Sequence, residues 1–348
     1  MKIERKLKTK RKLALILAIC MILSFTACSS DKKNRSDLSG TNDAADEKKE
    51  ITIVLDWTPN TNHTGLYVAK ELGYFDEAGL NVNIIQPPEN GATDLVASGG
   101  AQFGIDFQEY LAPAFGTENP LPVIAVAAIL QHNTSGIVSL KEKGIDNPVK
   151  LEGMRYATWE IPIEQAIIKD SVTKNGGDFS KVSLIPAYVD DIVAALNTDI
   201  DCVWIYYGWD GIKLELENVD TNFLYIKDMY EDFDFYSPVI IANTDYVENN
   251  PDEAKAFLNA VRKGYEYAAE HPKEAADILL KCVPELDSEL VHASQEYLSG
   301  QYIADAEGWG IIDGTRWDAF YKWVNDNGLV EKEIEAGAGF TNEYLSTK

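Results

Sequence analysis

Short apolar runs alternate with longer amphipathic segments along most of the chain. Runs rich in β-branched residues and bounded by Gly, Pro or polar residues predict strands. Segments whose apolar residues recur every three or four positions predict helices. The predicted strands are 51–55, 82–85, 102–106, 123–130, 134–140, 154–157, 182–186, 202–205 and 236–242, and the predicted helices are 64–72, 91–97, 163–172, 192–196, 253–269, 272–282, 288–298 and 317–325.

The order of these elements indicates how the chain is organised. Strands that alternate with helices build mostly parallel sheets with helices on both faces. A first series starts at Ile51 and a similar one starts near Lys141, so we expect an α/β protein of two lobes. Residues 51–140 and 238–348 should form lobe 1 and residues 141–237 lobe 2. The crossings near 140 and 238 would leave a cleft between two mostly parallel sheets, each flanked by helices.

The first 28 residues have the pattern of a secretory leader. Met1 to Lys12 is strongly basic, and the apolar run 13–25 is too short to indicate a membrane span. Phe25-Thr26-Ala27-Cys28 resembles the bacterial lipoprotein box. The resemblance implies that residues 1–27 are a signal peptide removed before Cys28, whose sulfur would carry a diacylglyceryl group. The alternative is an ordinary secreted protein with an unused cysteine.

Residues 28–50 contain Ser, Asp, Asn, Lys and Glu and almost no apolar side chain. Such a segment cannot bury enough surface to fold, so we expect a disordered tether. A globular part held to the membrane by a lipid on Cys28 and a polar tether would work at the extracytoplasmic face of the cell membrane.

Charge and cysteine content exclude several classes of protein. The formal net charge is −25, and seven Lys/Arg with one Glu give residues 1–27 a charge of +6, so the remainder carries −31. This balance argues against nucleic acid and other polyanions as partners and permits a neutral or cationic ligand. Cys202 and Cys282 lie in apolar contexts, which favours buried free thiols. With four His and no CxxC or HExxH pattern, we expect no metal site, and we expect a monomer.

Polar and aromatic side chains gather where predicted strands end. The strand 51–55 runs into a loop in which Pro59 and several Asn and Thr residues exclude regular structure. Open α/β sheets bind ligands at such strand ends. Trp204 lies inside an apolar strand, so we expect it in the core. The candidate binding residues are Asp56, Trp57, Asn60, His63, Gln108, Glu109, Trp159, Glu160, Glu164, Tyr207, Trp209 and Asp210.

The chain from about Ile51 onward resembles the type II periplasmic-type solute-binding proteins of ABC transporters. The segment Tyr74-Phe75-Asp76-Glu77-Ala78-Gly79-Leu80 is typical of the branch that includes nitrate, sulfonate and taurine binders. The loop from Asp56 to Leu66 is similar to the ThiY group, which binds N-formyl-4-amino-5-aminomethyl-2-methylpyrimidine, a thiamine-salvage precursor. Tyr207-Gly208-Trp209-Asp210 also resembles that group, in which Glu stands at the last position. The resemblance implies a binding subunit without a cofactor that delivers its ligand to an ABC permease.

An aminopyrimidine offers a flat π face and an edge of alternating hydrogen-bond donors and acceptors. Trp57, Trp159, Tyr207 and Trp209 are candidates to stack on the ring, at about 0.5–1.5 kcal/mol for each ring beyond area burial. Asp210, Glu160, Glu164 and Asp56 are candidates to accept from the exocyclic amine, and Asn60 and His63 to donate to a formyl oxygen. Asp210, next to Trp209, is the best placed of the carboxylates.

Two other functions remain open. A binder of another small solute, such as a sulfonate, would need Arg or Lys at the strand ends, and the clusters contain none. Eukaryotic thiamine-pyrimidine synthases share a similar first loop, and their active-site His would match His63. The leader and the lack of a Cys-rich run favour a binding protein over that enzyme. The sequence does not distinguish the formyl compound from the aminomethyl or hydroxymethyl pyrimidine, or from thiamine.

Overall fold

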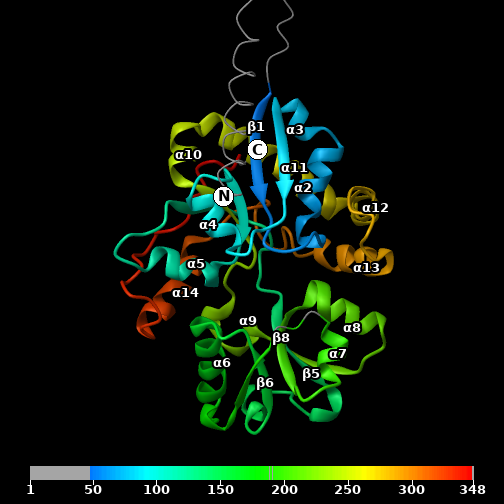
Figure 1. The fold of residues 1–348 in the computed structure, drawn as a ribbon, viewed down its shortest axis with the longest axis vertical. Helices are drawn as coiled ribbons and strands as arrows, with labels where there is room; N and C mark the ends of the chain where they lie inside the picture. Colours follow the sequence, from blue (N-terminus) through cyan, green and yellow to red (C-terminus); the bar gives the residue numbers. More distant parts are fainter. Residues whose placement is uncertain (1–47, 188, 190, 347–348) are drawn as a thin grey trace, which may run out of the picture. The chain divides into compact units, whose positions relative to one another are not determined.

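The computed structural model describes residues 48–187, 189 and 191–346, and its strands form two five-stranded sheets (Figure 1). In the first sheet β10 runs antiparallel to β3 and β4, while β1 is parallel to β2 and β3. Four of the five strands therefore share one direction. In sheet order the strands are β2 (Leu80–Ile85), β1 (Lys49–Val54), β3 (Phe103–Asp106), β10 (Val239–Asn243) and β4 (Val123–Ala128).

The second sheet repeats this arrangement. Strand β5 runs antiparallel to β8 and β9, and β6 is parallel to β7 and β8. The expected α/β fold with two mostly parallel sheets is thus confirmed. In sheet order the strands are β7 (Ser183–Pro186), β6 (Arg155–Thr158), β8 (Cys202–Tyr206), β5 (Ser135–Leu140) and β9 (Thr221–Tyr225).

The division between the lobes differs from the expected one at a single strand. Residues up to 140 are predicted to belong to lobe 1, but β5 pairs within the second sheet. The chain therefore leaves the first sheet after β4 and returns to it at β10. An apolar run predicts a strand without indicating its partner, because pairing depends on contacts distant in sequence. Strand β1 also begins at Lys49, so the last two residues assigned to the tether 28–50 belong to the sheet.

Helices cover both faces of the first sheet, because the side chains of β10 are apolar on both faces. Ile240 and Ala242 enter one apolar cluster and Val239 and Ile241 the other, so both faces are buried. Figure 1 shows α12 and α13 on the same side of this sheet as α2, with α5 and α14 on the other side. The helices of seven or more residues are α2 (Thr64–Glu71), α4 (Gly91–Ala97), α5 (Gln108–Phe115), α6 (Pro162–Lys174), α11 (Pro251–Glu270), α12 (Pro272–Cys282), α13 (Ser288–Ser299) and α14 (Gly314–Asp326).

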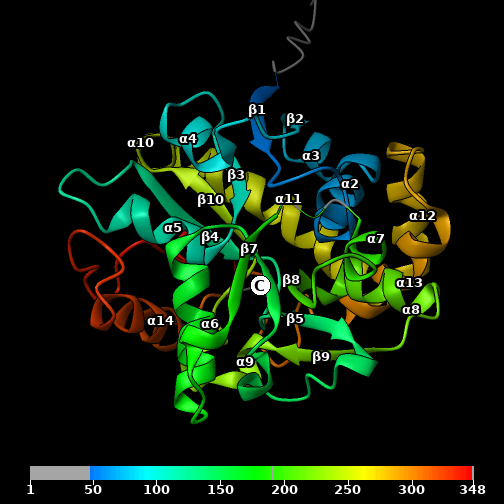
Figure 2. The same ribbon diagram turned by 60° about the horizontal axis from the view of Figure 1, so that its bottom comes forward.

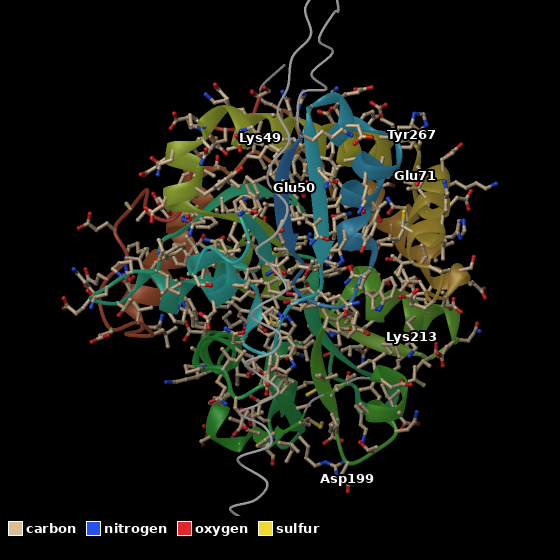
Figure 3. All side chains as sticks on the ribbon, turned by 45° about the horizontal axis from the view of Figure 1, so that its top comes forward. Lys49, Glu50, Glu71, Asp199, Lys213 and Tyr267 are labelled. Atoms are coloured by element: carbon tan, nitrogen blue, oxygen red, sulfur yellow. The ribbon has the colours of Figure 1, made fainter. Side chains whose placement is uncertain are left out.

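Shorter helices and surface contacts complete the lobes. Figure 2 shows α6 alongside the second sheet, and Ile163 and Ile167 of α6 share a buried cluster with Tyr156 of β6. At the surface Glu71 of α2, which is labelled in Figure 3, forms an ion pair with Lys281 of α12. The shorter helices are α3 (Tyr74–Glu77), α7 (Ile192–Leu196), α8 (Ile212–Leu216), α9 (Ile226–Met229) and α10 (Thr244–Asn249), the 3-10 turns η1 (Thr61–His63), η2 (Lys141–Lys143), η3 (Pro148–Leu151), η4 (Phe179–Lys181) and η6 (Glu231–Phe233), and the π-turn η5 (Tyr207–Gly211).

Three further expectations concern cysteines and the membrane. Cys202 and Cys282 are free thiols; Cys202 is buried, but Cys282 is exposed at the end of α12, which corrects the prediction that both are buried. Among the described residues, none of the helices combines the length and apolarity needed to cross a membrane. The predicted signal peptide 1–27, Cys28 and most of the tether lie outside the described residues.

Candidate functional site

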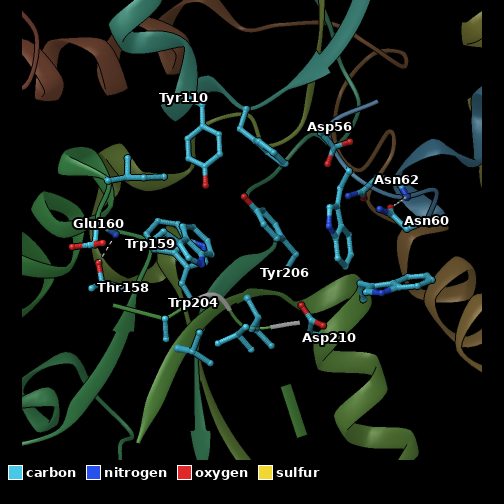
Figure 4. Close-up of a pocket in the computed structure, with 18 of the residues that line it drawn as sticks. Asp56, Asn60, Asn62, Tyr110, Thr158, Trp159, Glu160, Trp204, Tyr206 and Asp210 are labelled. Atoms are coloured by element: carbon cyan, nitrogen blue, oxygen red, sulfur yellow. Dashed lines mark hydrogen bonds between the residues drawn. The ribbon is translucent and has the colours of Figure 1, made fainter. Parts of the chain in front are cut away.

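A cavity of about 660 Å³ lies where strands of both sheets end (Figure 4). Residues that follow β1, β3, β6 and β7 line it together with the last residues of β8. These are carboxyl ends of strands, where open α/β sheets place their ligands. The lining residues are Asp56, Trp57, Asn60, Asn62, Phe107, Tyr110, Thr158, Trp159, Glu160, Ile161, Pro186, Ala187, Val189, Val203, Trp204, Ile205, Tyr206, Trp209 and Asp210.

The loop after β1 presents Asp56 to this cavity with the help of His63. The backbone N–H of Asn60 donates to Nδ1 of His63 over 3.1 Å, so the ring proton lies on Nε2, which donates to Oδ1 of Asp56 over 2.6 Å. The side chain of His63 is fully buried and that of Asp56 is 7% exposed. Oδ2 of Asp56 has no partner in the described part of the chain. His63 therefore positions a carboxylate and does not itself line the cavity.

Aromatic rings form most of the cavity wall. Trp57 lines the cavity and is 40% exposed, and the rings of Trp159 and Trp204 lie 5.7 Å apart at 41°. The expectation that Trp204 belongs only to the core is corrected: the side chain is buried, but it lines the cavity, and its indole N–H has no hydrogen-bond partner in the described residues. Phe107 from lobe 1 stacks on Tyr206 from lobe 2 at 5.3 Å. Flat rings on several sides suit a flat aromatic ligand.

The second strand end places Asp210 and Trp209 on the wall through the π-turn η5. The carboxylate of Asp210 makes no side-chain hydrogen bond within the described residues. Burial raises its pKa to about 6, because the ionised form has lost water without gaining a donor. An unpaired carboxylate on a cavity wall is a ready acceptor for a ligand amine.

Tyr207 does not reach the cavity, although it was a candidate to stack on the ligand. Its ring packs against Phe223, Tyr225 and Tyr297, and its hydroxyl donates to Glu215. The neighbouring Tyr206 lines the cavity instead. Successive strand residues point to opposite faces, so Tyr206 shares a face with Trp204. This alternation could have identified Tyr206, had Trp204 not been assigned to the core.

Three of the candidate residues are buried beside the cavity without lining it. Gln108 accepts from the backbone N–H of Tyr236 over 2.9 Å and donates to the carbonyl of Trp317 over 3.0 Å. Glu164 accepts from the hydroxyls of Tyr156 and Thr158 over 2.6 and 2.8 Å, and so supports the loop that carries Trp159.

Glu109 is the third of these buried residues. Its Oε1 accepts from the hydroxyl of Ser237 over 3.3 Å, and burial raises the pKa of Glu109 to about 8. Glu160, in contrast, lies on the cavity wall, with φ at 62° and its N–H donating to the hydroxyl of Thr158 over 3.0 Å.

The charges on the wall have one sign. Asp56, Glu160 and Asp210 line the cavity, and no Lys, Arg or His is among its described lining residues. Within residues 48–187, 189 and 191–346, there is also no group of three or more His, Cys, Asp or Glu side chains placed to hold a metal ion. The arrangement can therefore stack a flat ring and accept hydrogen bonds from its amino groups.

Known proteins that are similar to this chain in sequence include a binding protein and a synthase. A formylaminopyrimidine-binding protein of Halalkalibacterium halodurans is 29% identical over 87% of this chain and 93% of its own length. A 4-amino-5-hydroxymethyl-2-methylpyrimidine phosphate synthase of Legionella pneumophila is 25% identical over 86% of this chain and 93% of its own length.

Among solved structures, the alkanesulfonate-binding protein SsuA from Xanthomonas axonopodis pv. citri, bound to MOPS, superposes with a TM-score of 0.65 and 10% identity, over 86% of this chain and 99% of that one. This similarity establishes the periplasmic-binding-protein fold. The sequence profile of one family, described as NMT1/THI5 like, matches residues 60–275, and the chain belongs to that family.

Proposed function

We propose that this protein is the lipid-anchored, extracytoplasmic solute-binding subunit of an ABC importer. In this proposal it is not an enzyme, and it binds N-formyl-4-amino-5-aminomethyl-2-methylpyrimidine or a close relative between its lobes. The observation that carries the proposal is the cavity wall, whose described lining residues include seven aromatic side chains and three carboxylates and no basic group. Two stacked rings and one charged hydrogen bond contribute about 2.5–6 kcal/mol. Burial of the ring and methyl group supplies further affinity.

The same wall argues against a sulfonate. A sulfonate is permanently anionic and is favoured by a cation in its site, and none of the described lining residues supplies one. The hydroxyl of Thr93 and the backbone N–H of Phe107, which lie near the cavity, both donate to the protein's own carboxylate at Asp106. These donors are therefore not available to an anionic ligand.

The geometry of His63 argues against a synthase that uses this residue as a reactive group. Both ring nitrogens are engaged, one with Asn60 and one with Asp56, and the side chain has no exposed surface. Such a ring could react only after leaving both partners. It is suited to fixing the orientation of Asp56, which is the role we assign to it.

The ligand class can be tested by thermal denaturation. Aminopyrimidines should raise the melting temperature, because a ligand at 100 times its dissociation constant stabilises the protein by about 2.7 kcal/mol. Taurine, alkanesulfonates and nitrate should leave it unchanged, because the wall offers them no cation. A larger increase with a sulfonate than with every pyrimidine tested would contradict the proposal.

The anchoring can be tested separately through Cys28. Replacing Cys28 with alanine should move the protein from the membrane fraction to the soluble fraction, because the proposed lipid is attached to the sulfur of Cys28. Ligand binding should remain unchanged, because the cavity is built from residues 56 onward. Fractionation after a high-salt wash measures the effect. Retention of the variant in the membrane fraction would rule out the lipid anchor.

A further inference from the structure

A second cavity, of about 440 Å³, adjoins the first one. The two share Asp56, Phe107 and Tyr110 as lining residues, so the second cavity lies next to the place where a ligand would bind in the first. The far side of the second cavity consists of residues 90–94 at the start of α4, the end of β3, and part of α5. The space is therefore suited to a substituent of the ring.

Three carboxylates line this second cavity, and none of its described lining residues is a Lys, Arg or His. Asp94 lies at the exposed rim, while Asp56 and Asp106 lie deeper. Asp56 is the decisive group, because its side chain is 93% shielded from solvent and only one of its oxygens is held, by His63. Its other oxygen has no hydrogen-bond partner among the described residues, and Asp56 lines both cavities.

Asp106 adds a second uncompensated charge. Its two oxygens accept from the hydroxyl of Thr93 and from the backbone N–H of Phe107, both neutral donors. Burial and the neighbouring charge of Asp56 raise the pKa of Asp106 to about 6, so at neutral pH it is mostly ionised. The backbone N–H groups at the start of α4 favour negative charge, but Asp94 and Asp106 already supply it.

On the basis of the proposed function, we propose that the preferred ligand is a cationic aminopyrimidine whose protonated aminomethyl group enters the second cavity between Asp56 and Asp106. The ring would lie among the aromatic side chains of the first cavity. An ammonium group donates up to three hydrogen bonds, so it can bond to both carboxylates, and its single positive charge offsets half of their combined negative charge. Formylation of the same amine removes its charge and leaves one donor, so two largely buried carboxylates would remain without a counter-charge.

The test compares three pyrimidines by calorimetry on the purified full-length protein at pH 7.5. The ligands are 4-amino-5-aminomethyl-2-methylpyrimidine, its N-formyl derivative and the 5-hydroxymethyl analogue. They share one ring and differ in charge. The amine should bind at least about tenfold more tightly than either neutral compound. Tighter binding of the formyl derivative would overturn this inference and leave the proposed function intact, whereas failure of all three to bind would overturn both.

A variant of Asp106 tests whether the amine of the ligand lies in the second cavity. Asp106→Asn should weaken binding of the aminomethyl compound about tenfold and change binding of the hydroxymethyl analogue less than about twofold. Asp252→Asn, an exposed carboxylate on α11 outside both cavities, is the matched control and should change neither affinity. If Asp106→Asn does not fold, Asp94→Asn at the exposed rim is used instead. It should weaken binding of the aminomethyl compound by a smaller factor and leave binding of the hydroxymethyl analogue unchanged. Equal losses for the amine and the hydroxymethyl compound would contradict the placement.

Discussion

Replacing Asp210 with alanine should weaken binding of an aminopyrimidine by about tenfold to a hundredfold. The variant leaves a buried ligand amine without its acceptor, which costs about 1–3 kcal/mol. Asp210→Asn keeps the size of the side chain but turns a charged hydrogen bond into a neutral one, so a loss of about five- to thirtyfold is expected. Asp210→Glu, which introduces the residue expected in the ThiY group, should be tolerated. Calorimetry on the three variants measures these effects.

In the ligand-free protein, the ionised carboxylate of Asp210 should lower the free energy of unfolding, although the same carboxylate strengthens ligand binding. Burial raises the pKa of Asp210 from 3.8 to about 6, so the folded state holds a proton that the unfolded state has already released. Stability should therefore fall as pH rises from about 4 to about 6, and the loss should persist at higher pH. Asp210→Asn removes this contribution, which is about 3 kcal/mol at pH 7. The variant should be more stable than the wild type at pH 7 and still bind ligand less well.

Asp228→Asn is a suitable control, because Asp228 is an exposed carboxylate of the same lobe that does not line either cavity. It should change neither stability nor affinity. If both Asp210→Asn and Asp210→Ala fold normally and bind with unchanged affinity, Asp210 does not contact the ligand. Glu160 and Asp56, which share the wall, would then be the remaining acceptors.

The sequence predicted the elements of the fold and most of the cavity wall, because both depend on local patterns. Charged residues and tryptophans that come soon after an apolar run are visible without any tertiary information, and this rule identified Asp56, Trp159 and Asp210. It could not identify Phe107 or Tyr110, since nothing local distinguishes an aromatic side chain on a cavity wall from one in the core. Contacts between lobes, such as the stacking of Phe107 on Tyr206, exist only after the chain has folded.

Two errors have the same physical origin. Strand β5 was assigned to the wrong lobe because the partner of a strand is chosen by contacts far away in sequence. Tyr207 was preferred over Tyr206 because a shift of one residue moves a side chain to the opposite face. Side chains alternate between the two faces along β8, and this can be seen in the sequence. The last residue of the alternation is set by the π-turn that follows β8. That turn is specified by its packing against α13, which was not visible in the local pattern.

The largest loss of stability is expected from a glycine remote from the ligand. A Cβ atom on Gly264 of α11 would lie 2.0 Å from the carbonyl oxygen of Gly65 in α2. The obstacle is backbone, so no side-chain rotation relieves it, and the two helices would have to separate. In a helix interior Gly→Ala otherwise stabilises by up to about 1 kcal/mol. We expect Gly264→Ala instead to destabilise the protein by about 3 kcal/mol, as overpacking of a tight interface does.

Urea denaturation of Gly264→Ala tests this contact, with Gly300→Ala as the matched control. Gly300 ends α13 with φ at −78°, and the nearest atom to an added Cβ is 3.9 Å away, so alanine should be accepted there. The effect of Gly264→Ala should extend to the ligand, because the hydroxyl of the adjacent Tyr265 donates to the carbonyl of Asn62 over 2.6 Å. Asn62 lines the cavity, so separation of α11 from α2 would shift the loop that carries Asp56. Equal stability of the two variants would mean that the helices are not held in direct backbone contact.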